Sequence, residues 1–63
     1  MKWYENWDYE NHEPYWWSTR DKRGICFEIR KKGEYLVLFL GEHEKFISRH
    51  STLQEAMDAA NEY

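Results

Sequence analysis

The sequence has few of the residues on which several common kinds of small protein depend. It has a single cysteine, Cys26, so no intrachain disulfide can form and a disulfide-stapled secreted scaffold is excluded. Its three glycines are scattered, so there is no glycine-rich loop of the kind that cradles a phosphate. The longest apolar run, 35–40, has the length of a strand and falls far short of the ~20 residues that cross a bilayer. No apolar run at the N-terminus resembles a signal peptide, and we expect a cytoplasmic protein.

Charge is unevenly distributed along the 63 residues, whose formal net charge is −3. Residues 1–15 carry four acids against one lysine, and residues 51–63 carry three acids and no base. The middle of the chain, 16–34, carries six Lys or Arg against three acids. The acidic total argues against nucleic-acid binding, which needs a basic face, although a local basic patch is compatible with this pattern.

Aromatic residues are concentrated at the start of the chain. Seven of the first seventeen residues are Trp or Tyr, and they are interleaved with four carboxylates. A domain of this length has little core in which to bury such large side chains. We therefore expect some of these rings to cover the sheet and others to meet a partner.

The periodicity of the sequence predicts an α+β fold: a three- or four-stranded antiparallel meander with one C-terminal helix packed on one face (βββα). Strands are expected at 15–20, 25–30 and 35–40, with turns between them, and 45–48 is a short fourth strand or an extended connection. Residues 1–14 are expected to form an aromatic and acidic N-terminal arm or short strand, and 15–63 the single βββα domain. The helix begins with a capping box, either Ser51 with Gln54 or Thr52 with Glu55. Because the helix covers only one sheet face, we expect the aromatic N-terminal segment to fill the other.

Catalytic and metal-binding patterns are absent from the sequence. His43 lies between Glu42 and Glu44, but three successive side chains of one turn diverge, so no metal site is expected. Cys26 has no base nearby in the sequence and is interpreted as a buried structural thiol. We expect no enzymatic activity and no cofactor, because a pocket of ~300 Å³ or more is hard to build in so short a chain.

The helix start Ser51-Thr52-Leu53-Gln54-Glu55-Ala56 resembles that of integrase arm-type and AP2-like DNA-binding domains. Such domains place the exposed face of their sheet in the major groove, and the resemblance implies Arg20, Arg30 and Trp17 as the nearest counterparts here. In size, acidity and aromatic content the chain also resembles small accessory proteins of phages and mobile elements, anti-CRISPR proteins among them. That resemblance implies an inhibitor of a host enzyme or defence complex.

Our first hypothesis is a non-enzymatic protein-binding module, an anti-CRISPR-like inhibitor of a host nucleic-acid-handling protein. Acids beside aromatics can imitate the backbone and bases of a nucleic acid and so occupy a protein that binds it. The expected partner-binding residues are Trp3, Tyr4, Trp7, Asp8, Glu10 and Glu13.

Two alternatives remain open at this stage. The first is a small sheet-type DNA-binding module that contacts phosphate through Arg20, Lys22, Arg23, Arg30, Lys31 and Lys32. The second is a homodimer, because small domains often stabilise themselves by pairing an exposed strand or aromatic face. No membrane partner is expected.

Overall fold

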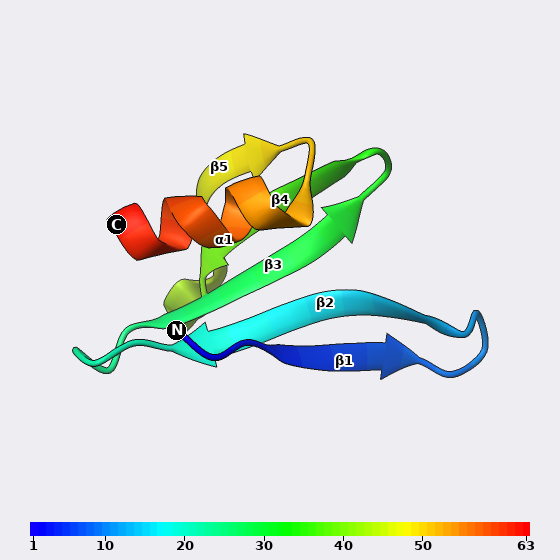
Figure 1. Cartoon of the computed structure of the whole chain (residues 1–63), viewed down its shortest axis with the longest axis horizontal. Coiled ribbons are helices and arrows are strands. Elements are labelled where there is room, and N and C mark those ends of the chain that lie inside the picture. Colours follow the sequence, from blue (N-terminus) through cyan, green and yellow to red (C-terminus); the bar gives the residue numbers. More distant parts are fainter.

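The computed structural model describes all of residues 1–63 and contains one five-stranded antiparallel sheet and one α-helix. The strands pair in chain order, each with its neighbours in the sequence (Figure 1). A short 3₁₀ turn, Glu42–Glu44, precedes the last strand. The elements are β1 (Tyr4–Asp8), β2 (Glu13–Arg20), β3 (Cys26–Lys32), β4 (Tyr35–Leu40), β5 (Lys45–His50) and α1 (Leu53–Glu62).

The predicted α+β meander with a C-terminal helix is confirmed, with five strands where three or four were expected. The uncertain segment at 45–48 forms β5 and continues to His50. The additional strand is β1, so the N-terminal segment takes the strand form rather than that of an arm. Glu5 and Asn6 of β1 pair with Trp17 and Trp16 of β2. Segment 1–14 therefore belongs to the same sheet as the rest of the chain.

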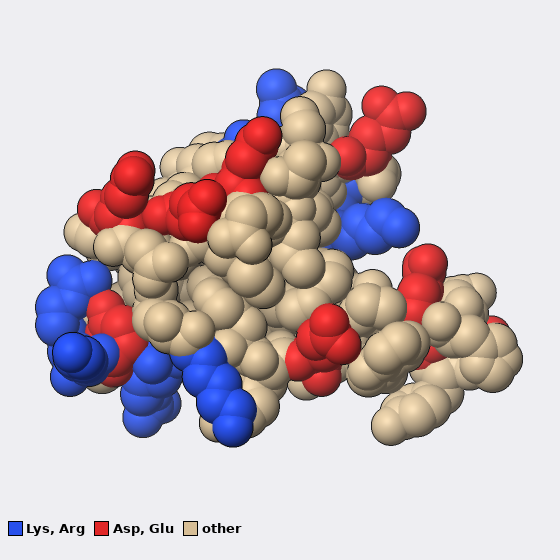
Figure 2. All heavy atoms as spheres, viewed as in Figure 1, with Lys and Arg blue, Asp and Glu red and all other residues tan.

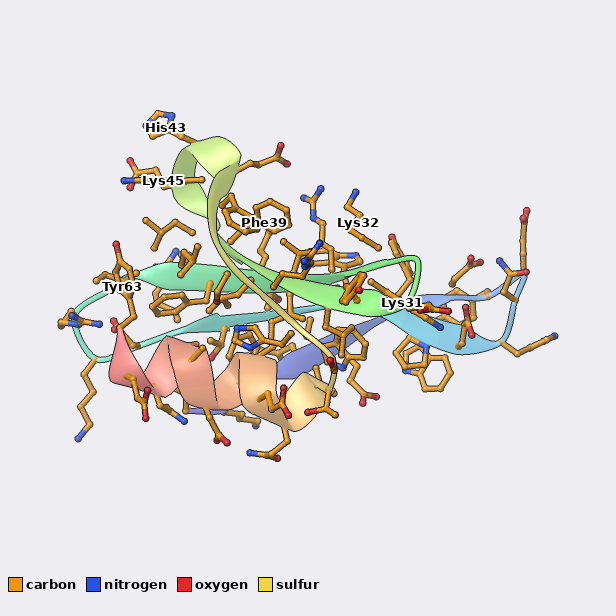
Figure 3. All side chains as sticks on the ribbon, turned by 90° about the horizontal axis from the view of Figure 1, so that it is seen from above. Lys31, Lys32, Phe39, His43, Lys45 and Tyr63 are labelled. Atoms are coloured by element: carbon orange, nitrogen blue, oxygen red, sulfur yellow. The ribbon has the colours of Figure 1, made fainter.

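The expectation that the N-terminal segment fills the second sheet face was wrong. β1 lies at the edge of the sheet, in its plane, because its backbone groups find their hydrogen-bond partners sideways on β2. Figure 3 shows α1 on one side of the sheet and the side chains of Lys32 and Phe39 on the other, which no helix like α1 covers and where the short 3₁₀ turn Glu42–Glu44 rises at one end. We call this uncovered side the open face.

The core lies between α1 and the face of the sheet that α1 covers, which is the face opposite the open face. Phe27 and Ile29 of β3 and Leu38 of β4 are fully buried, and they pack with Ala56 and Ala60 of α1. The alternation of β3 places Phe27 and Ile29 under the helix and Glu28, Arg30 and Lys32 on the open face. The two alanines are small enough to let the helix approach the sheet closely.

Local signals fix the ends of these elements. Thr52 is the helix N-cap, and its hydroxyl accepts a hydrogen bond from the backbone N–H of Glu55 at 3.2 Å. Of the two N-cap residues considered, Ser51 and Thr52, the structure therefore uses Thr52. In the β2–β3 turn Gly24 has a φ of 85°, which side chains disfavour. At ten residues and with a polar face, α1 lacks the length and apolar character of a membrane-spanning helix.

The helix does not extend over the whole sheet. It contacts β3, β4 and β5, whereas β1 and β2 project beyond it as a two-stranded hairpin (Figure 1). A single helix of ten residues is ~15 Å long, so it cannot cover five strands. The hairpin that carries most of the aromatic residues is therefore only partly buried.

Candidate functional site

The far end of the β1–β2 hairpin is rich in exposed aromatic rings and in acids. Trp7, Tyr9 and Tyr15 are between 47% and 85% exposed. We call this end the hairpin tip and define it by Trp7, Asp8, Tyr9, Glu10, Glu13 and Tyr15. In Figure 2 the corresponding end of the molecule shows acidic and uncharged atoms, whereas the largest group of basic atoms lies at the opposite end and smaller groups lie at the top and just above the hairpin. The hairpin tip therefore offers apolar area bordered by negative charge.

Asp8 organises the turn at this tip. Its carboxylate accepts hydrogen bonds from the side-chain amide of Asn11 at 2.6 Å and from the backbone N–H groups of Glu10 and Asn11. The bond from the Asn11 side chain, helped by the two backbone bonds, holds the pKa of Asp8 below its ordinary value in spite of some desolvation. Three of the roughly four acceptor sites of the Asp8 carboxylate are thus engaged within the chain.

The other residues predicted to bind a partner are divided between three environments. Trp3 packs against the edge of the core, and the neighbouring Lys2 carbonyl accepts a hydrogen bond from the Thr19 hydroxyl. Tyr4 is exposed on the open face. Trp7, Glu10 and Glu13 lie with Asp8 at the hairpin tip, where Glu13 approaches Lys31 to 3.9 Å.

The open face carries a second concentration of aromatic and charged side chains. The strand register places Trp16, Arg30, Val37 and Arg49 in one row across β2, β3, β4 and β5. The adjacent row contains Lys32 and Tyr35, which face each other across β3 and β4. On the other side of the Trp16 row, Glu28 faces Phe39. Rings and cations therefore lie close together over the middle of this face, with Val37 and Glu28 among them.

Arg30 is held in a network on the open face. Its guanidinium contacts Glu28 at 3.0 Å and Glu44 at 2.9 Å, and it lies over the ring of Phe39 at 5.8 Å. Desolvation would lower the pKa of Arg30, but the two carboxylates outweigh it and raise that pKa. Arg30 is thus neutralised within the chain and serves to position its neighbours.

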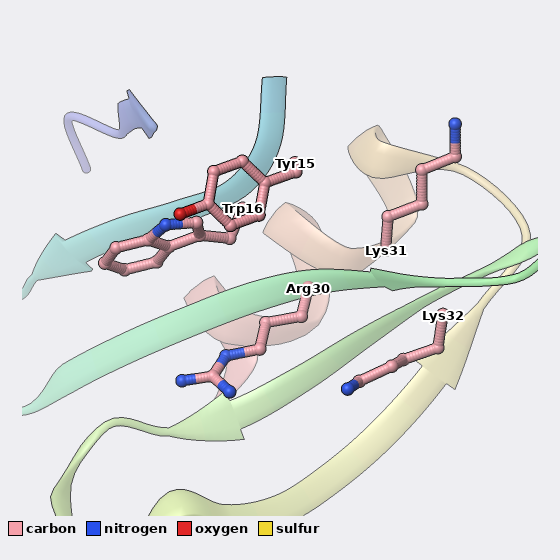
Figure 4. A pocket seen from close by; sticks show the side chains of 5 residues that line it. All are labelled: Tyr15, Trp16, Arg30, Lys31 and Lys32. Atoms are coloured by element: carbon pink, nitrogen blue, oxygen red, sulfur yellow. The ribbon is translucent and has the colours of Figure 1, made fainter. Parts of the chain in front are cut away.

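The six basic residues of the DNA-binding alternative do not form one cluster. Lys22 and Arg23 lie in the β2–β3 turn, where Arg23 pairs with Asp21 at 2.7 Å. Arg20 ends β2 close to this turn, whereas Arg30, Lys31 and Lys32 lie toward the other end of β3. Figure 4 shows Arg30 and Lys32 leaving β3 on one side and Lys31 on the other. Lys31 therefore does not belong to the open face.

A shallow hollow of about 430 Å³ lies beside Trp16 (Figure 4). It is lined by Tyr15, Trp16, Arg30, Lys31 and Lys32. Its two rings meet edge to face, with centroids 6.4 Å apart. The hollow therefore joins an aromatic wall from β2 to a basic wall from β3.

Sequence reasoning missed the exposure of Tyr9 and Tyr15 and the partial exposure of Trp16, and it misplaced Cys26. Whether a ring in a strand is buried depends on where the helix ends, which no local pattern reveals. Cys26 was expected to be buried, but it is partly exposed on the open face, where its Sγ accepts a hydrogen bond from Arg20 Nε at 3.2 Å. No group of three or more His, Cys, Asp or Glu side chains is arranged to hold a metal ion.

Comparison with known proteins gives no assignment: no family model, curated protein or solved structure matches this chain.

Proposed function

We propose that this protein is a non-enzymatic, cytoplasmic binding module that engages a protein partner through the hairpin tip. The observation that carries the proposal is the exposure of Trp7, Tyr9 and Tyr15 at an end of the sheet that the helix does not cover. Tyr and Trp are the residues most enriched at the energetic centres of protein interfaces. A small monomer gains nothing in stability from rings that remain in water, so their exposure favours a role in binding.

The acids of the hairpin tip favour a partner with a basic surface. Glu10 and Glu13 flank the exposed rings, and no Lys or Arg belongs to the tip. Negative charge beside planar rings resembles the phosphates and bases that a nucleic-acid-binding protein contacts. We therefore propose that the partner handles nucleic acid and that this protein inhibits it, in the manner of phage anti-CRISPR inhibitors of a host defence complex.

The test is a pull-down from nuclease-treated bacterial lysate with the wild-type protein and a double variant, Tyr9→Ala with Glu10→Lys. These two residues suit the test because Tyr9 has the most exposed ring and because Glu10 donates to Asp8 through its backbone N–H, so that its side chain is free to change. We expect the wild type to retain a stoichiometric protein and the variant to lose it. For the purified partner, affinity should fall about thirtyfold or more, which corresponds to the loss of one central interface residue.

Glu62→Lys is the matched control, because it makes the same charge change at the exposed end of α1. Circular dichroism of all variants checks that the fold survives. If the double variant binds as tightly as the wild type, the hairpin tip is not the interface. Sedimentation of the protein alone separates a further case: a homodimer that the double variant dissociates would assign the tip to self-association.

A second candidate is the sheet-type DNA-binding module, with Arg20, Lys22, Arg30 and Lys32 contacting phosphate. It is favoured by one observation, namely that Arg20, Arg30 and Lys32 share the open face. Binding to a DNA duplex should weaken steeply as salt rises, because phosphate contacts release counterions. Capture that disappears on nuclease treatment would favour this candidate over the first.

A further inference from the structure

We propose that the open face binds single-stranded nucleic acid, with bases stacking on Trp16 and Tyr35 and phosphates contacting Lys32 and Arg49. The inference deepens the second candidate, since it names the kind of nucleic acid and the residues that recognise it. It uses a different surface from the hairpin tip and stands independently of the proposed protein partner.

The first step of the argument is the arrangement of rings. Trp16 and Tyr35 come from β2 and β4 and lie on either side of the basic residues of β3, in adjacent rows of the open face. Two residues along a strand advance ~7 Å, so adjacent rows on one face are separated by about this distance. Tyr35 is among the exposed large side chains, and Trp16 lines an open hollow. Both rings are therefore partly accessible to planar groups.

The second step concerns charge. Arg30 is neutralised by Glu28 and Glu44, but Arg20, Lys32 and Arg49 take part in none of the ion pairs of the chain. Arg49 instead lies over one face of the Tyr35 ring, 4.4 Å from its centre, and leaves the rest of that ring for a base. A guanidinium beside a ring can contact a phosphate while the ring stacks on the attached base. The open face thus carries three cations without carboxylate partners on a protein whose total charge is negative.

The third step concerns which kind of polyanion fits the open face. A duplex hides the faces of its bases, and an acidic peptide has none, so neither can use the rings. An extended single strand exposes both bases and phosphates, and such strands are commonly bound by aromatic side chains on a positively charged surface. The pairing of rings with unneutralised cations therefore favours a single strand. The carboxylates of Glu28 and Glu44 confine the path to the half of the face near Lys32 and Tyr35.

The experiment measures the fluorescence anisotropy of labelled dT12, with a 12-base-pair duplex and poly-glutamate as unlabelled competitors. We expect dT12 to bind with a slope of log K against log salt of about −1.4, which is the value for two phosphate contacts on a single strand. We expect unlabelled dT12 to compete much better than the duplex or poly-glutamate. Equal competition by poly-glutamate would show a general polyanion surface and would overturn the proposal.

Lys31 and Lys32 provide a matched pair of variants. They are adjacent in β3 and leave it on opposite sides (Figure 4), so Lys32→Glu and Lys31→Glu make the same charge change on different faces. We expect Lys32→Glu to weaken dT12 binding about tenfold and to reduce the salt slope by about 1, and Lys31→Glu to have less than about a third of that effect. Equal losses in the two variants would mean that the open face is not the site.

Trp16→Leu tests the stacking step. We expect binding to weaken about fivefold or more, the lower bound for the loss of one stacked base, with the salt slope unchanged because no phosphate contact is removed. Trp16→Phe keeps a ring and should retain most of the affinity, which provides the readout if the leucine variant folds poorly. The same duplex is therefore also measured with a label of its own: wild-type protein that ignores dT12 but binds the labelled duplex would overturn this inference and leave the second candidate standing. Failure to bind either would remove both and leave the hairpin-tip proposal unaffected.

Discussion

The Oδ2 atom of Asp8 accepts a hydrogen bond of 2.6 Å from the side-chain amide of Asn11, three residues later in the β1–β2 turn. The Oδ1 atom of the same carboxylate accepts the backbone N–H groups of Glu10 and Asn11. Asp8 was expected to meet a partner, but these contacts give it a role in shaping the hairpin tip. A substitution of Asp8 would therefore disturb the turn as well as any contact with a partner. For this reason the binding experiment substitutes Glu10 instead.

The stability of the protein is expected to fall on acidification because of two aspartates that anchor turns. Asp8 is one, and Asp21 is the other. Desolvation opposes the ionisation of Asp21, but hydrogen bonds from Arg23 and from the backbone of Ile25 outweigh it, so the pKa of Asp21 is also lowered. Because the folded-state pKa values lie below 3.8, this stabilisation is present above that pH and is lost as the pH falls through the lowered values.

Thermal melts followed by circular dichroism between about pH 6 and about pH 2 measure this dependence. We expect Tm to decline below about pH 4 in the wild type and to decline less in the double variant Asp8→Asn with Asp21→Asn, which removes both titrating groups. Glu62→Gln removes an exposed carboxylate without intramolecular contacts and should leave the wild-type curve unchanged. If Tm falls as steeply with acidification in the double variant as in the wild type, other carboxylates cause the loss of stability.

The part of the fold that depends on local sequence was predictable. The alternation in 25–30 and the spacing of Leu53, Ala56, Met57 and Ala60 each report a period that matches one kind of element. The turns at Gly24 and Gly33 were marked by residues that accept a positive φ, and both glycines have one. These signals are local, and the structure agrees with them.

The arrangement of β1 and the candidate surfaces depended on information that is not local. In 1–13 the aromatic spacing suits both a helix and a strand, and only pairing with β2 decides between them. The same holds for the rings: Trp17 is buried and its neighbour Trp16 is not, because α1 lies over one face of the sheet and leaves the other open. The length and position of one helix therefore determine which aromatics remain available for binding.

Leu38→Ala is expected to unfold a large fraction of the protein. Leu38 is fully buried between Ile29 and the helix, and truncation of such a leucine costs about 2–5 kcal/mol. A domain of this size has a total stability of only about 3–5 kcal/mol. Urea titration at low temperature measures the loss. Tyr9→Ala, at the most exposed ring, should change the midpoint little, and an equal loss there would contradict the burial of these two residues.

Thr52→Ala is expected to lower the free energy of unfolding by about 1 kcal/mol, because it removes the oxygen that accepts the N–H of Glu55. Thr52→Ser keeps the acceptor and should lose only a small part of this amount. Ser51→Ala is the discriminating control, since the sequence allowed either residue to be the cap and the structure selects Thr52. Comparable destabilisation by Ser51→Ala would show that the helix begins one residue earlier.

Trp17→Phe is expected to lower the free energy of unfolding by less than the size of the deleted part of the ring suggests. Trp17 is buried against the core, and its indole N–H has no hydrogen-bond partner. An unpaired buried donor carries a desolvation penalty of about 1–3 kcal/mol, which phenylalanine does not have. That relief offsets part of the packing lost with the smaller ring, so we expect a net destabilisation below about 1.5 kcal/mol, against about 3–5 kcal/mol for Trp17→Ala. Urea titrations of the two variants measure both values. If Trp17→Phe is as damaging as Trp17→Ala, the indole N–H contributes to stability through a contact that it does not make in this structure.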